Sequence, residues 1–257
     1  MTVSNSKGCI IVTGASRGIG AAISLGLARA GYTVGCLSRS GESPQVDGAT
    51  EADRSKWFSA KCDVSLPKQL KEAFSDIVKR SGHPIVGLVN NAGIHSQGRV
   101  ESIAEAEFKK VMDVNAYSVL AASQMAYPHL LENKGGLIVN IGSFFDKLGI
   151  KQHLTYCATK AAVAAMTRCM AVEWASKGIR VLNVAPGYIQ TDFNREMIEK
   201  GPLGEFLTKR IPGGVPGNAH DVGQLVTSLF VLNSPYMTGE TSGVATVSAI
   251  TFGLAPG

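Results

Sequence analysis

The sequence predicts an α/β fold, in which helices cover both faces of a doubly wound parallel sheet. Apolar segments of strand length alternate with segments of helical periodicity along nearly the whole chain. The first apolar segment runs into a glycine-rich turn that opens a helix, as a strand–helix–strand unit does. The 257 residues suffice for a sizeable core, and no linker, repeat or low-complexity segment divides them. We therefore expect one domain over residues 1–257.

The first half of the chain supplies four expected strands, each rich in apolar or β-branched residues. They cover residues 9–12, 32–37, 57–64 and 85–89. Apolar spacing predicts helices at residues 21–30 and 66–80. A polar loop is expected at about residues 38–54, between the second and third strands.

The alternation continues in the second half, which supports a parallel sheet covered on both faces. Strands are expected at residues 137–141, 179–185 and 244–250. Helices are expected at residues 103–131, 155–176 and 219–232. Residues 188–218 form a long polar segment with a helical pattern inside it. Long connections in compact domains are often lids or binding loops, so we expect this segment to border the substrate.

The glycine-rich turn after the first strand reads T-G-A-S-R-G-I-G and ends at Gly20. Glycine permits unusual backbone dihedral angles and lets a ligand approach the main chain. The helix that follows offers unpaired N–H groups and the positive end of its dipole to a pyrophosphate. The spacing G-x-x-x-G-x-G differs from the common dinucleotide fingerprint, so the position of the turn carries the inference.

The end of the second strand indicates which dinucleotide binds. Folds that prefer NAD usually place Asp or Glu there to hold the ribose hydroxyls, whereas this chain has Ser38 and Arg39. Arginine suits a 2′-phosphate because its planar fork donates to oxyanions. Arg17, inside the glycine turn, is placed to reach the same phosphate. The cofactor expected is therefore NADP(H).

Residues 142–160 hold the expected reaction chemistry. Tyr156 and Lys160 are four residues apart, so a helix would place both side chains on one face. An ammonium beside a phenol favours the phenolate, so we expect Lys160 to lower the pKa of Tyr156. A phenol tuned in this way exchanges a proton with an alcohol or ketone near neutral pH. Ser143 would hold the reacting oxygen.

These motifs, in this order, resemble the short-chain dehydrogenase/reductase family, from about residue 9 to residue 241. The resemblance implies a single-domain Rossmann-type fold. In the glycine turn, the implied cofactor contacts are Gly14, Ser16, Arg17, Gly18, Ile19 and Gly20. Elsewhere they are Ser38, Arg39, Asp63, Val64, Asn91, Ala92, Gly93, Tyr156, Lys160, Pro186, Gly187, Ile189 and Thr191.

The resemblance also implies an activity, the reduction of a ketone to a secondary alcohol, with Tyr156 as the proton donor. Ser143 would orient the carbonyl oxygen, Lys160 would hold the nicotinamide ribose, and Asn115 would position Lys160. NADPH-dependent 3-oxoacyl-carrier-protein reductases and carbonyl reductases are the most similar members, so a 3-oxoacyl thioester is one expected substrate. Two alternatives stay open: oxidation of a sugar, polyol or other secondary alcohol, and NADP(H) sensing without catalysis.

Candidate substrate contacts follow Ser143, surround His95 or lie in the long loop. They are Phe144, Phe145, Leu148, His153, Tyr188 and Phe193. Their aromatic character suits an apolar or ring-bearing ketone, although Phe144 and Phe145 could instead pack the core or an interface. His95 and His153 are expected to be loop histidines that face solvent rather than proton carriers.

Charge and cysteine content narrow the classes of partner and location. The net charge of +5 is scattered without a run of like charges, which argues against nucleic acid. No apolar run is long enough to span a membrane. The five cysteines lack C-x-x-C or metal-ligand spacing, so we expect free thiols, no metal and a cytoplasmic protein. The resemblance implies a homo-oligomer, a tetramer or dimer, but the chain departs from the family pattern after Thr241.

Overall fold

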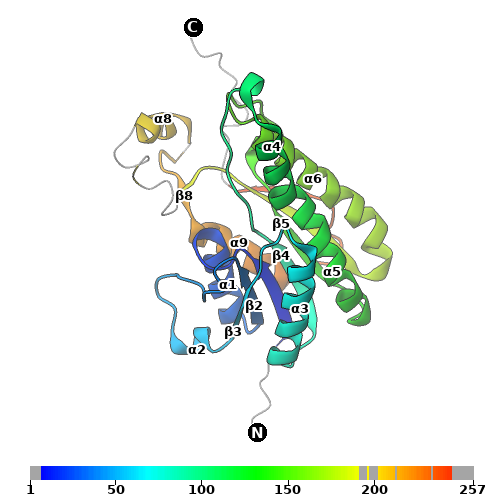
Figure 1. Cartoon of the computed structure of the whole chain (residues 1–257). Helices are drawn as coiled ribbons and strands as arrows, with labels where there is room; N and C mark the ends of the chain where they lie inside the picture. Colours follow the sequence, from blue (N-terminus) through cyan, green and yellow to red (C-terminus); the bar gives the residue numbers. More distant parts are fainter. Residues whose placement is uncertain (1–6, 191–195, 197–201, 212, 233, 245–257) are drawn as a thin grey trace.

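The computed structural model describes residues 7–190, 196, 202–211, 213–232 and 234–244. In this part of the chain, seven strands form one parallel sheet (Figure 1). They are β1 (Cys9–Thr13), β2 (Thr33–Ser38), β3 (Trp57–Lys61), β4 (Ile85–Asn90), β5 (Gly136–Ile141), β6 (Ile179–Pro186) and β9 (Thr241–Val244). Their order is β3-β2-β1-β4-β5-β6-β9, so the chain winds outward in both directions from β1 and β4.

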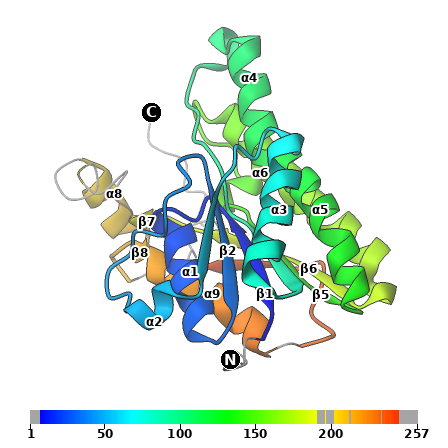
Figure 2. The same cartoon turned by 60° about the horizontal axis from the view of Figure 1, so that its bottom comes forward.

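Helices cover both faces of the sheet (Figure 2). One face packs against α1 (Gly18–Arg29) and α9 (Ala219–Leu232). The other packs against α3 (Pro67–Ser81), α5 (Ser118–Glu132) and α6 (Leu154–Trp174). The shorter helical elements are α2 (Glu51–Arg54), η1 (Val100–Ser102), α4 (Glu105–Met112), η2 (Asp113–Tyr117), η3 (Phe144–Asp146), η4 (Ala175–Lys177) and α8 (Pro202–Arg210). The predicted fold class is confirmed.

The alternation of side chains along β1 explains why both faces are apolar. Ile10 and Val12 enter the core under α1 and α9, whereas Cys9 and Ile11 enter the core under α3 and α5. Successive residues of a strand point to opposite faces, and a central parallel strand is buried on both. The continuous apolar sequence of β1 therefore follows from its position at the centre of the sheet.

Four sequence predictions need correction. The helix expected over residues 103–131 is interrupted, because η2 is a π-helical segment between α4 and α5. The third strand ends at Lys61 rather than at residue 64, and α2 forms inside the expected polar loop. The last strand was predicted to begin at residue 244, whereas β9 covers Thr241–Val244; residues 245–250 lie outside the described residues.

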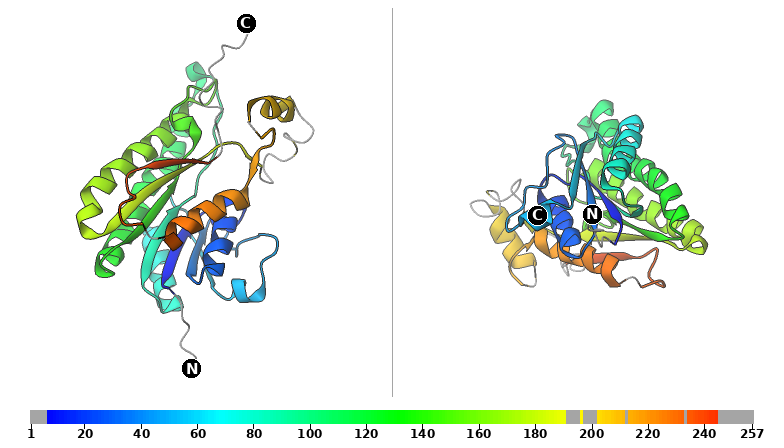
Figure 3. Two further views of the ribbon diagram at one scale, coloured as in Figure 1. Left: turned by 180° about the vertical axis from the view of Figure 1, so that it is seen from behind. Right: turned by 90° about the horizontal axis from the view of Figure 1, so that it is seen from below.

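The long segment at residues 188–218 contains the predicted helix, α8. Two short strands, β7 (Ile189–Gln190) and β8 (Gly217–Asn218), pair in parallel and form a separate small sheet. Figure 3 shows α8, in gold, standing away from the main sheet on the side opposite the amino terminus. Because the strands run from that terminus, α8 lies toward their carboxyl ends. No helix in the described part of the chain is long and apolar enough to cross a membrane.

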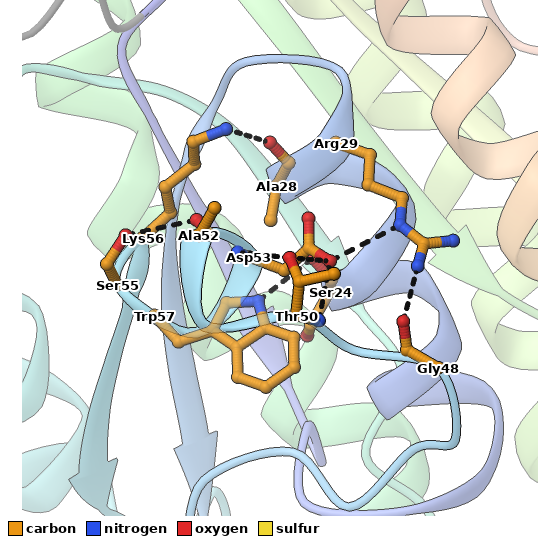
Figure 4. Close-up of polar contacts among 10 residues, drawn as sticks. All are labelled: Ser24, Ala28, Arg29, Gly48, Thr50, Ala52, Asp53, Ser55, Lys56 and Trp57. Carbon is orange, nitrogen blue, oxygen red and sulfur yellow. Dashed lines mark hydrogen bonds and ion pairs between the residues drawn. The ribbon is translucent and has the colours of Figure 1, made fainter.

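A polar network fastens the connection between β2 and β3 to α1 (Figure 4). Arg29 donates to the Gly48 carbonyl at 2.6 Å and pairs with Asp53 at 3.4 Å. Asp53 and Thr50 form a capping box that begins α2. The indole of Trp57 donates to the Ser24 carbonyl at 3.2 Å. These contacts fix the loop beside the carboxyl end of β2.

Candidate active site

A cleft of about 760 Å³ opens at the carboxyl ends of β1, β2, β3 and β4. Open α/β sheets bind ligands at this edge, where the strand order reverses, and the volume is typical of ligand pockets. Twelve predicted cofactor residues line it: Gly14, Ser16, Arg17, Ile19, Gly20, Ser38, Arg39, Asp63, Val64, Asn91, Ala92 and Gly93. The structure therefore brings together residues that are up to 79 positions apart in the chain.

Two glycines of the turn are required by close packing. Gly14 has a left-handed φ of +65°, and a Cβ added to it would lie 2.9 Å from Ala92 Cα. A Cβ on Gly20 would lie 2.2 Å from the Gly14 carbonyl oxygen, which no real side chain tolerates. The absence of side chains at both positions lets α1 begin directly at the end of β1. Its free N–H groups then face the cleft.

Hydrogen bonds from the segment after β4 hold the glycine turn in place. The hydroxyl of Thr13 accepts from the main-chain N–H groups of Asn91 and Ala92, each at 3.0 Å. The side-chain amide of Asn91 donates to the carbonyl oxygens of Thr13 and Gly14, also at 3.0 Å. Asn91 therefore shapes the cleft as well as lining it. Sequence alone indicated only the second role.

The lining of the cleft carries charges of both signs. Arg17 and Arg39 contribute positive charge, and Glu42 and Asp63 contribute negative charge. A hydrogen bond from Ser65 is the main cause of the lowered pKa of Asp63, with a smaller contribution from Arg39. The prediction for the end of β2 considered Ser38 and Arg39 alone and missed Glu42.

Six further lining residues were also missed: Ser40, Cys62, Ser65, Ile94, Lys110 and Val114. Lys110 and Val114 are four residues apart on the helical segment that leads to Asn115. Residues with this spacing share a helix face, so the i,i+4 pattern was the available signal. Nothing in the sequence marks the other four, because their positions depend on how the loops fold.

Ser143 and Tyr156 meet beside the carboxyl end of β5. Ser143 is 7% exposed and directly follows Gly142, and its hydroxyl accepts from the Phe145 N–H at 3.2 Å. Tyr156 lies in the first turn of α6. Burial raises the pKa of Tyr156, and a hydrogen bond from Ser143 lowers it by a smaller amount. Tyr156 is therefore a protonated phenol at neutral pH.

Lys160 lies one turn further along α6 and is 5% exposed. Its Nζ donates to the Ile141 carbonyl at 2.8 Å and lies 5.6 Å from the centroid of the Tyr156 ring. Burial lowers the pKa of Lys160 to about 8. The expectation that Lys160 brings the pKa of Tyr156 below its usual value is wrong for this structure, because desolvation of the phenol outweighs the other effects.

Asn115 connects the cleft to α6 and is 1% exposed. Its amide forms two hydrogen bonds of 2.8 Å with the main chain of Ile94 and a third, of 3.3 Å, with the Thr159 hydroxyl. It lies in the π-helical segment η2, and such segments often occur at functional sites. Its described contacts reach the residue before Lys160 rather than Lys160 itself.

Aromatic rings surround Tyr156 on its other side. Tyr156 lies 5.1 Å from His95 and 5.9 Å from Phe145, measured between ring centroids. His95 is exposed and His153 partly exposed, as expected for loop histidines, and their rings also contact each other at 4.9 Å. Packing lowers the pKa of His95, and His153 lowers it further. Leu148 is partly buried, and Phe193 lies outside the described residues.

The remaining predicted nicotinamide contacts follow β6. Pro186 ends the strand and Ile189 begins β7, while Gly187 between them is partly buried. None of these three lines the cleft, nor do Gly18, Tyr156 and Lys160. Thr191 lies outside the described residues. Their contacts with a cofactor stay predictions.

Comparison with known proteins agrees with the fold and the cleft. Residues 8–201 match the family model described as short chain dehydrogenase. The chain therefore belongs to the short-chain dehydrogenase family. It is an oxidoreductase that acts on a secondary alcohol or a ketone with a nicotinamide cofactor.

Curated relatives differ in the substrate that their names give. The chain is 33% identical to a 2-dehydro-3-deoxy-D-gluconate 5-dehydrogenase of Bacillus subtilis, over 91% of each chain. It is 33% identical to the 3-oxoacyl-[acyl-carrier-protein] reductase FabG of Staphylococcus epidermidis, over 90% of this chain and 94% of the relative. Similarity at this level therefore shows the family without deciding the substrate.

Solved structures differ likewise in the bound cofactor. A 7α-hydroxysteroid dehydrogenase complexed with NADH and 7-oxo glycochenodeoxycholic acid superposes with a TM-score of 0.84 at 26% identity, covering 93% of each chain. ElxO with NADP bound superposes with a TM-score of 0.81 at 28% identity, covering 93% of this chain and 97% of ElxO.

Proposed function

We propose that this protein uses NADPH to reduce a ketone to a secondary alcohol. One observation carries the proposal: the contact between Ser143 and Tyr156, with Lys160 one helical turn away, beside a cleft that suits a dinucleotide. A protein that only senses a dinucleotide has no use for a hydrogen-bonded serine and tyrosine with a buried lysine. The arrangement thus favours catalysis over sensing.

In the proposed reaction the phenol of Tyr156 donates its proton to the carbonyl oxygen. Tyr156 is protonated at neutral pH, which is the state that a proton donor needs. Ser143 donates a hydrogen bond to the same oxygen and orients it. A bound reduced nicotinamide supplies the hydride that reduces the carbonyl carbon.

The proposal gives Lys160 and Asn115 supporting roles. With a pKa of about 8, Lys160 is mostly an ammonium at pH 7 and can hold the hydroxyls of the nicotinamide ribose. A cation there also stabilises the phenolate that remains after proton donation. Asn115 supports this part of α6 through Thr159, and Pro186, Gly187, Ile189 and Thr191 would border the nicotinamide.

For the cofactor we propose NADP(H) rather than NAD(H). The two arginines that line the cleft, Arg17 and Arg39, suit a 2′-phosphate. The carboxylate of Glu42, which also lines the cleft, would repel a 2′-phosphate, so the preference for NADP(H) requires a test. The substitution Arg39→Asp should shift the ratio of kcat/KM for NADPH and NADH more than tenfold toward NADH. A preference of the wild type for NADH would contradict the assignment.

The relatives suggest two substrate classes for a direct assay. The similarity to FabG suggests a 3-oxoacyl thioester as substrate, and the similarity to the gluconate-type dehydrogenase suggests oxidation of a sugar acid. We propose reduction as the main activity. A screen of ketones, including acetoacetyl thioesters, with NADPH, and of sugars and polyols with NADP⁺, tests it. Faster turnover with the alcohols would favour the second candidate.

We also propose that the protein is a cytoplasmic homo-oligomer, a tetramer or dimer. Several large apolar side chains are exposed, among them Val172 on α6 and Leu232 at the end of α9. Contact between subunits would remove such side chains from water. Sedimentation velocity measures the assembly, and a single monomeric species at micromolar concentration would contradict the proposal.

A further inference from the structure

Six aromatic side chains form a continuous group beside the candidate proton donor. We call them the ring cluster: His95, Phe144, Phe145, His153, Tyr156 and Tyr188. Neighbouring ring centroids lie between 4.6 Å and 6.5 Å apart. The rings come from four segments that meet at the carboxyl end of the sheet: the loops after β4 and β6, η3, and the start of α6.

The ring cluster is not an ordinary part of the core. Only Phe145 is buried, His95 is exposed and the other four rings are partly exposed. Leaving aromatic surface in water costs free energy in proportion to its area, so exposed rings that gather at one place usually serve binding. Phe144 directly follows Ser143, and its partly exposed ring lies 5.1 Å from that of Tyr188, measured between centroids.

The position of the two histidines is fixed by the loops that carry them. The Gly98 N–H donates to the Gln152 carbonyl at 2.8 Å, and the side chains of Gln97 and Gln152 bond at 3.0 Å. Gln152 has a φ of +67°, which is rare for a residue other than glycine. Backbone strain of this kind persists where the surroundings enforce it and is concentrated at binding sites.

The ring of His153 is held as well. Its Nδ1 lies 2.8 Å from the Lys151 carbonyl oxygen, which only accepts, so Nδ1 carries the proton. His95 is then placed between His153 and Tyr156, with ring centroids 4.9 Å and 5.1 Å away. A preformed aromatic surface binds a rigid, flat group at little entropic cost.

We propose that the preferred substrate is a ketone that carries a flat ring next to the carbonyl group, and that His95 is a specificity-determining residue. This inference rests on the proposed function. Offset and edge-to-face contacts between rings lie at the spacing seen in the ring cluster. A sugar acid would need a hydrogen-bonding partner for each of several hydroxyls, whereas the cluster offers six ring surfaces and polar atoms only on its two histidines and two tyrosines.

The test compares two ketones of equal carbon number, acetophenone and cyclohexyl methyl ketone. An acetoacetyl thioester and a keto-sugar acid complete the panel, and all are assayed with NADPH in the full-length protein. Two substitutions of His95 distinguish the effect of its ring from the effect of its nitrogen atoms. His95→Leu removes the ring, and His95→Phe keeps a ring without nitrogen atoms. The KM for NADPH reports whether the cofactor cleft is intact.

We expect acetophenone to give the highest kcat/KM of the panel in the wild type. His95→Leu should lower the ratio of kcat/KM for the aryl and cyclohexyl ketones about fivefold, which corresponds to about 1 kcal/mol. His95→Phe should keep this ratio within about twofold. Phe144→Leu, which removes a ring on the opposite side of the cluster, should act like His95→Leu.

Two results would overturn the inference, and they are distinguishable. The ring preference is wrong, but ketone reduction stands, if the thioester, the sugar acid or the cyclohexyl ketone gives a higher kcat/KM than acetophenone. The same holds if His95→Leu leaves the ratio of kcat/KM for the aryl and cyclohexyl ketones unchanged. If no ketone is reduced although NADPH binds, the proposed function fails, and the inference fails with it.

Discussion

At the scale of single residues, burial decides the charges at the site. Lys160 is buried and Tyr156 is partly buried, and desolvation shifts each toward its neutral form. For the tyrosine this favours the protonated phenol, which the proposed reduction needs. For the lysine it makes the charged form costly, because the described contact of Nζ is a carbonyl and not a carboxylate.

The first prediction concerns the stability cost of Lys160. Its pKa falls from 10.5 to about 8 on folding, which corresponds to about 3 kcal/mol at pH 7. Lys160→Met keeps the volume but removes the charge, and it leaves the Ile141 carbonyl without that donor. We therefore expect the variant to be about 2 kcal/mol more stable at pH 7 in urea unfolding, and inactive.

The sign of the pH dependence follows from the same shift. Between about pH 8 and 10.5 the unfolded wild type binds more protons at Lys160 than the folded state does. The loss of folding free energy caused by Lys160 therefore becomes smaller as pH rises. The stability gap between Lys160→Met and wild type should narrow from pH 7 to pH 10. The exposed Lys71, changed to Met, controls for loss of a lysine charge. A gap that widens, or a less stable Lys160→Met, would refute this account.

At the scale of elements, a buried polar network joins β4 and β5 to the helices beneath the site. The Asn90 amide donates to the Asn140 side chain at 2.9 Å and to the Ser123 hydroxyl at 3.2 Å. Asn140 donates in turn to the Thr167 hydroxyl at 2.9 Å. Because all four side chains are buried, each bond that is lost leaves a polar group without water.

The second prediction follows from this network. Asn140→Ala removes two bonds, leaving Asn90 with its bond to Ser123 and Thr167 with its bond to the Val163 carbonyl, and it opens a buried cavity, so we expect the free energy of unfolding to fall by about 3 kcal/mol. Ser123→Ala removes a single acceptor and should cost about 1 kcal/mol. Equal effects of the two substitutions in urea unfolding would show that the network is not centred on Asn140.

The elements also show how far sequence patterns reach. The interior strands of the sheet were predictable because apolar segments buried on both faces are distinctive, as in β1 and β6. The π-helical segment η2 was not predictable, since five residues between two α-helices are too few to show a period of their own. α2 was missed because four residues with a capping box are too short to show a period.

At the scale of the whole molecule, the candidate site depends on contacts between distant segments. The glycine turn, Ser143, Tyr156 and Lys160 were predictable because each carries a local motif. The positions of Glu42 and Lys110 in the cleft and the contact of His95 with His153 were not predictable. They arise because loops far apart in sequence come together in the fold. The direction of the Tyr156 pKa was wrong for the same reason: a neighbouring charge is visible in sequence, whereas burial is a property of the folded chain.

The central claim is that this fold carries a ketone reductase whose proton donor is Tyr156. The direct measurement is the kcat of Tyr156→Phe with NADPH and a ketone that the wild type reduces, alongside the Kd for NADPH from fluorescence titration. The account predicts a loss of at least about a hundredfold in kcat, as expected for a general acid, with an unchanged Kd. A variant that keeps the wild-type rate would contradict it.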